Sequence, residues 1–105
     1  MFRQGDVLLI PTNERVPRNT QPEKADNGRL ILMHGEATGH AHAVLERDAT
    51  IRSRGTGMTV ERWLSVHKAT SLQHEEHAAI ALPVGTYKIL RQREYSPEAI
   101  RNVAD

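Results

Sequence analysis

Four of the six histidines in this sequence lie in two short clusters whose spacing suits metal binding. The first is His40-Ala41-His42, at the start of an alternating segment that we expect to form a strand from His40 to Leu45. Side chains two residues apart on a strand share a face, so both imidazoles can turn toward one cation. Glu46 follows on the same face if the strand continues, and a carboxylate commonly completes an imidazole site.

The second cluster is His74-Glu75-Glu76-His77, which directly precedes the apolar run 78–82. A spacing of three brings both histidines onto one face of a helical turn, and a tight turn can do the same. The two glutamates between them offer further ligands or a general base. The alternative for both clusters is an exposed polar surface, since imidazoles are common at the surface of a sheet. The clusters form one site only if the fold brings them together.

These clusters predict a site for one divalent metal ion: zinc, manganese, iron or nickel. The predicted ligands are His40, His42, Glu46, His74 and His77. Neighbouring polar residues are predicted to support the ligands, namely Glu36, Thr38, Glu75 and Glu76. The sequence contains no Gly-rich phosphate loop and no serine or cysteine nucleophile motif. Whether the protein is an enzyme therefore stays open, and no catalytic residue is assigned.

Short strands separated by glycine and proline are expected to position these histidines, in an all-β single domain over residues 1–105. Such a pattern is typical of a small barrel or a sandwich. Residues 12–28 are polar and contain two prolines, which indicates a long loop or arm. Residues 94–105 form a C-terminal tail in which Ser96-Pro97 indicates a short helical turn. The expected strands are Val7–Ile10, Arg29–His34, His40–Leu45, Thr50–Arg54, Met58–Val66, Thr70–His74, Ile80–Leu82 and Thr86–Arg93.

The composition excludes some other classes and argues against others. Fourteen Lys and Arg residues balance thirteen Asp and Glu residues, so the chain lacks the charge excess of a disordered protein or a typical nucleic-acid binder. No cysteine is present, which excludes disulfides and thiolate zinc sites. The sequence has no leader-like N-terminus and no apolar run near the ~20 residues of a membrane span. We expect a soluble, cytoplasmic protein.

Gly35, His40-x-His42-x-x-x-Glu46 and Gly55 together resemble the first cupin motif, and 82–86 resembles the Pro-x-Gly core of the second. This resemblance implies a β-barrel that holds a metal through two histidines and a glutamate. Lys88 stands where the second motif places a histidine, so His74 or His77 would have to replace that ligand. The chain as a whole also resembles small bacterial and phage proteins with a Gly-Glu-x-Thr-Gly-His-x-His signature, a resemblance that implies no function.

The alternative function is a metal-free interaction or regulatory module, an adaptor in a larger assembly. Its contact surface would include Arg91, Arg93 and Tyr95, and the partner would be another protein or a second copy of this chain. Single-stranded nucleic-acid binding is the third possibility. It requires a basic groove lined with aromatic residues, whereas the chain has four aromatic residues and a net charge of +1.

Overall fold

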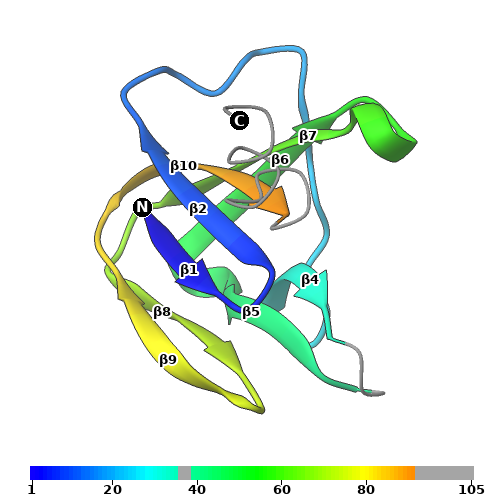
Figure 1. The fold of residues 1–105 in the computed structure, drawn as a ribbon. Helices are drawn as coiled ribbons and strands as arrows, with labels where there is room; N and C mark the ends of the chain where they lie inside the picture. Colours follow the sequence, from blue (N-terminus) through cyan, green and yellow to red (C-terminus); the bar gives the residue numbers. More distant parts are fainter. Residues whose placement is uncertain (36–38, 92–105) are drawn as a thin grey trace, which may run out of the picture.

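The computed structural model describes residues 1–35 and 39–91, which form two antiparallel β-sheets packed against each other (Figure 1). Two short 3₁₀ turns, η1 (Glu46–Asp48) and η2 (Gly57–Thr59), precede β6 and β7. The strands are β1 (Phe2–Gln4), β2 (Val7–Thr12), β3 (Gln21–Pro22), β4 (Arg29–His34), β5 (Ala41–Leu45), β6 (Ala49–Arg54), β7 (Glu61–Val66), β8 (Thr70–His74), β9 (His77–Leu82) and β10 (Gly85–Arg91).

The larger sheet has the strand order β1-β2-β10-β7-β6-β3, and the smaller sheet has the order β4-β5-β8-β9. Within the described residues the two sheets are not closed into a barrel, so the fold is a sandwich. The predicted all-β class is confirmed. The β8–β9 hairpin, drawn in yellow in Figure 1, lies beside β1, so the two sheets meet at this corner.

Alternate residues of the strands supply the hydrophobic core between the sheets. Val7 and Leu9 of β2 and Leu64 of β7 are fully buried, and they pack with Val44 of β5. Each buried aliphatic side chain of this kind contributes roughly 1.5–3 kcal/mol of transfer free energy. His42 lies two residues before Val44 on the same strand and is itself buried. It therefore points inward, at the rim of the core.

Most predicted strands are present, with shifted ends. β4 and β8 have the predicted bounds, whereas β2 continues through Pro11 to Thr12 instead of ending before the proline. Proline fits there because β1 pairs only with residues 7–9, which leaves one side of β2 free at Pro11. The predicted strand from Met58 is shortened at its start by η2.

The predicted loop or arm at residues 12–28 contains the two-residue strand β3, which pairs with Arg52 and Ser53 of β6. Arg52 holds the segment by donating hydrogen bonds to the side-chain oxygen and the carbonyl of Thr20, at 2.9 and 2.6 Å. Thr20 is buried. The segment is thus fastened along the edge of the larger sheet.

The side chain of Arg62 forms hydrogen bonds that connect the two sheets. Arg62 of β7, in the larger sheet, donates two hydrogen bonds to the carboxylate of Glu23, at 2.8 and 2.7 Å. The same guanidinium donates to the backbone carbonyls of Leu32 and Ile31, at 2.5 and 2.9 Å. Both carbonyls belong to β4, the edge strand of the smaller sheet. Arg62 therefore satisfies polar groups that an edge strand otherwise leaves unpaired.

Several predictions concern residues outside the described ranges. These are the C-terminal helical turn and tail, the proposed contacts of Arg93 and Tyr95, and the supporting roles of Glu36 and Thr38. In residues 1–35 and 39–91 no helix has the length and apolar character needed to cross a membrane.

Candidate metal centre

The second histidine cluster forms the turn of the β8–β9 hairpin. His74 and His77 are directly paired across the two strands, and Glu75 and Glu76 form the two-residue turn between them. Opposed residues of an antiparallel pair project from the same face. The spacing of three therefore brings the two imidazoles together through a tight turn rather than a helical one.

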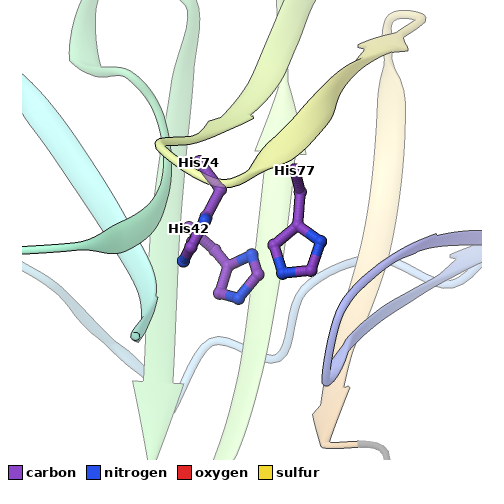
Figure 2. Close-up of side chains that lie close together, drawn as sticks. All are labelled: His42, His74 and His77. Carbon is purple, nitrogen blue, oxygen red and sulfur yellow. The ribbon is translucent and has the colours of Figure 1, made fainter. Parts of the chain in front are cut away.

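This hairpin places both of its histidines beside His42 of β5 (Figure 2). One ring nitrogen from each of His42, His74 and His77 lies within 4.8 Å of the others. The ring centres are 4.3 Å apart for His42 and His74, 4.7 Å for His74 and His77, and 5.6 Å for His42 and His77. Nitrogens bound tetrahedrally to zinc at about 2.0–2.1 Å lie about 3.3 Å apart, so the rings must draw slightly closer around an ion.

Gln4 fixes the orientation of His42. The amide nitrogen of Gln4 donates hydrogen bonds to the carbonyls of Leu72 and Ala78, both at 3.0 Å. These two bonds direct the amide oxygen toward His42, whose Nδ1 lies 2.8 Å away. Since that oxygen can only accept, His42 must carry its proton on Nδ1. Nε2 then keeps the lone pair that a metal needs.

Gly5 closes the turn between β1 and β2 directly against the histidines. A Cβ atom at this position would lie 3.0 Å from Nε2 of His77 and 3.1 Å from Cε1 of His42. The backbone φ of +55° is also one that other residues rarely adopt. Glycine is therefore required both by the turn and by the two rings that pack on it.

The surroundings of His42 keep this ring neutral. The pKa of His42 is lowered from its ordinary 6.5 to about 4, chiefly by burial and also by positive charge on His74 and His77. The carboxylates of Asp6 and Glu75 oppose this shift. A neutral imidazole is the form that binds metal, so protons compete little for His42 at neutral pH.

The lowered pKa predicts how the stability of the metal-free protein depends on pH. Between pH 6.5 and about 4 the unfolded chain binds a proton at His42 that the folded chain does not. The free energy of unfolding should therefore fall as the pH is lowered through this window, by at most about 3 kcal/mol, and this contribution should be constant above about pH 7. Urea denaturation from pH 4.5 to 7.5 measures the effect.

His42→Asn is the matched control for this pH dependence, because an asparagine amide can still donate to Gln4 but does not titrate. The loss of stability at low pH should be smaller in this variant than in the wild type. Parallel stability curves for the two proteins would show that His42 does not titrate as described.

The other predicted ligands of the first cluster do not join this group. His40 precedes β5 and lies instead with His74 and Glu75, whose donor atoms are also within 4.8 Å of one another. β5 ends at Leu45, and Glu46 begins η1, where its N–H donates to the carbonyl of Gly28. Glu46 is exposed and belongs to neither group, because the strand alternation that would align it with His42 stops one residue earlier.

The two predicted supporting residues in the described part of the site hold the hairpin turn. Glu75 accepts a hydrogen bond from the N–H of Ala41 at 2.9 Å, and this bond lowers the pKa of its carboxyl group. The N–H of Glu76 donates to Nδ1 of His74 at 3.0 Å. Glu75 thus anchors the turn to β5, and the backbone of Glu76 orients the ring of His74.

A family model described as a domain of unknown function (DUF8820) matches residues 3–92. The chain belongs to the DUF8820 family. The matched region of this DUF8820 domain includes Gln4, His42 and the whole histidine hairpin. This match does not support the cupin resemblance, and the sheets of the sandwich are not closed into the barrel which that resemblance implies. No curated protein and no solved structure matches the chain.

Sequence reasoning missed the contribution of the first turn to the site of this DUF8820 domain. Gln4, Gly5 and Asp6 are recognisable as a turn, but nothing in their pattern shows that the turn packs on His42 and His77. The unusual feature is the burial of Gln4, a polar residue on a short strand. A buried amide must find partners, and here the partners include a candidate ligand.

Proposed function

We propose that this protein binds one divalent metal ion through His42, His74 and His77. The observation that carries the proposal is the convergence of three ring nitrogens on one point, from a strand and a hairpin distant in sequence. The hydrogen bond between Nδ1 of His42 and the amide oxygen of Gln4 supports the proposal. Metal-binding histidines commonly donate a hydrogen bond from their second ring nitrogen to a fixed acceptor.

The donor set favours particular ions and a particular chemistry. Three neutral imidazoles suit zinc, nickel, copper or iron, and they leave the full charge of the ion in place. His77 and the turn residues are exposed, so solvent has access to the group. An ion held by three protein ligands keeps a position for water, and its charge acidifies that water. The proposed function is therefore metal binding. If the site is catalytic, activation of the bound water is the reaction that its open position supports.

Metal content and affinity test this proposal. Untagged protein should bind close to one zinc ion per chain in isothermal titration calorimetry, with a matching zinc content by elemental analysis. His42→Ala and His77→Ala should each weaken zinc binding at least tenfold, because each removes one of three ligands. His34→Ala and His67→Ala are the controls, since both histidines are exposed and lie outside the group. Equal zinc affinity in all four variants would contradict the proposal.

A protein-binding function is the second candidate, and a separate surface favours it. A groove of about 990 Å³ is lined by apolar side chains that include Met33, Met58 and Val60, with Arg62 and Arg91 among its charged residues. Met58 is fully exposed, and methionine adapts readily to different partners. This function would be favoured if the purified protein held no metal and its melting temperature were unchanged in chelator. In that case Met58→Asp should weaken binding of the partner protein or of a second copy of the chain.

A further inference from the structure

A second group of metal-competent atoms shares His74 with the proposed site. His40, His74 and Glu75 each offer one donor atom, all within 4.8 Å of one another. The rings of His40 and His74 are 5.8 Å apart and meet edge to face. This set contains two imidazoles and one carboxylate, a combination typical of iron(II) sites, and its carboxylate also suits manganese. It is a harder donor set than three imidazoles.

His40 carries an unpaired ring nitrogen in this group. Its Nδ1 is buried and has no hydrogen bond within the described part of the chain. Oε1 of Glu76 lies 3.5 Å away, without the geometry of a hydrogen bond. A buried polar atom without a partner is unfavourable, and in native proteins it often marks a missing water or ion. A cation bound to this nitrogen would supply the missing partner.

Glu75 is oriented as ligating carboxylates usually are. One oxygen accepts the hydrogen bond from Ala41, and the other lies 4.0 Å from Nη1 of Arg29, the first residue of β4. The backbone bond fixes the carboxylate and leaves its second oxygen able to turn toward an ion. Gly35 also matters, because a Cβ there would lie 2.8 Å from Nε2 of His74. The ring of His74 thus packs directly on the backbone of Gly35.

His74 cannot serve both groups at once. A neutral imidazole has one nitrogen with a lone pair and one that carries a proton, so it binds one cation. In the metal-free protein Nδ1 of His74 accepts the hydrogen bond from Glu76, which places the proton on Nε2. An ion at Nδ1 replaces that bond, and an ion at Nε2 moves the proton to Nδ1. Binding in either group therefore breaks the hydrogen bond from Glu76.

We propose that the protein has two overlapping metal sites that share His74 and hold one ion at a time. The site of His42, His74 and His77, on which this inference rests, takes zinc or nickel. The site of His40, His74 and Glu75 takes manganese or iron(II). The identity of the bound metal then decides which side of His74 is occupied and whether His40 or His77 is a ligand.

Paired titrations with Zn²⁺ and Mn²⁺ on untagged protein test the shared site, with Mn²⁺ followed by electron paramagnetic resonance. His77→Ala should weaken Zn²⁺ binding at least tenfold and leave Mn²⁺ affinity within about threefold of wild type. His40→Ala should weaken Mn²⁺ binding at least tenfold and leave Zn²⁺ affinity within about threefold of wild type. Glu75→Gln keeps an acceptor for the N–H of Ala41 and should weaken Mn²⁺ alone. Zn²⁺ should displace Mn²⁺ from the wild type at a total of one ion per chain.

The outcomes separate this inference from the proposed function. Failure of the wild type to bind Zn²⁺ would overturn the proposed function. Intact Zn²⁺ binding that depends on His77, with Mn²⁺ affinity unchanged in His40→Ala and Glu75→Gln, would overturn only the second site. Simultaneous binding of both ions would overturn the sharing of His74. The amide signal of Glu76 in ¹⁵N–¹H spectra should shift with either metal, and an unmoved signal would also count against ligation by His74.

Discussion

Replacing Gln4 with alanine should weaken zinc binding by about 10–100-fold and destabilise the metal-free protein by about 2–3 kcal/mol. The affinity falls because His42 loses the acceptor that keeps its proton on Nδ1 and its Nε2 lone pair available. The stability falls because the carbonyls of Leu72 and Ala78 lose their donor, and the first of them lies in a buried setting. Calorimetric titration with zinc and urea denaturation measure the two effects separately.

Gln4→Glu is the matched variant that separates orientation of His42 from stability. A carboxylate can still accept from Nδ1 of His42, but it cannot donate to the two carbonyls as the amide does. This variant should lose stability and yet bind zinc more tightly than Gln4→Ala. If the alanine variant bound zinc like the wild type, Gln4 would have only a structural role. Nitrogen chemical shifts of the His42 ring report its tautomer directly.

The largest effect on stability is expected from Arg62→Met, at about 3 kcal/mol. Methionine keeps much of the side-chain volume but removes the bidentate pair with Glu23 and both hydrogen bonds to the carbonyls of β4. Arg62 and Glu23 are only 20% and 27% exposed, so their interaction is weakly screened. Although burial raises the pKa of Glu23, the hydrogen bond and charge of Arg62 outweigh it and lower the pKa.

Arg54→Met is the control for the loss of an arginine. Arg54 pairs with Glu61 at 3.0 Å in a more exposed setting, and it should contribute about 1 kcal/mol or less. Thermal or urea denaturation of both variants measures the difference. The double variant Arg62→Met with Glu23→Gln should be less destabilised than the sum of the single variants, because each change removes the same pair. Strict additivity would show that Arg62 and Glu23 are not coupled.

The sequence predicted those strands that carry a strong apolar pattern and missed those that tertiary contacts create. β4, with its aliphatic run, has the predicted bounds, and the all-β class followed from such segments. β1 and β3 contain two or three residues with no alternation, and they are strands only because β2 and β6 pair with them. Pro11 was read as a strand end, although an unpaired edge of β2 accommodates it.

The candidate site was also predictable only in part, because local spacing marks the histidines but tertiary contacts complete the site. The types and spacing of the histidines marked both clusters, and the fold does bring His42, His74 and His77 together. Pairing His40 with His42 assumed that the strand begins at His40, but β5 begins one residue later. The contact of Gln4 with His42 joins two segments far apart in the chain, and local spacing carries no information about it.

The distance in sequence between the proposed ligands gives the site a consequence for the unfolded chain. His42 and His74 are about 30 residues apart, and the protein has no cysteine to form a covalent crosslink. An ion that joins them closes a loop of this length, and by the entropy estimate for disulfides such a closure is worth about 3–4 kcal/mol. Because His74 and His77 are neighbours on one hairpin, the unfolded chain still offers a weak two-histidine site, which offsets part of this gain. The metal would act as a reversible crosslink whose strength the cell sets through the supply of the ion.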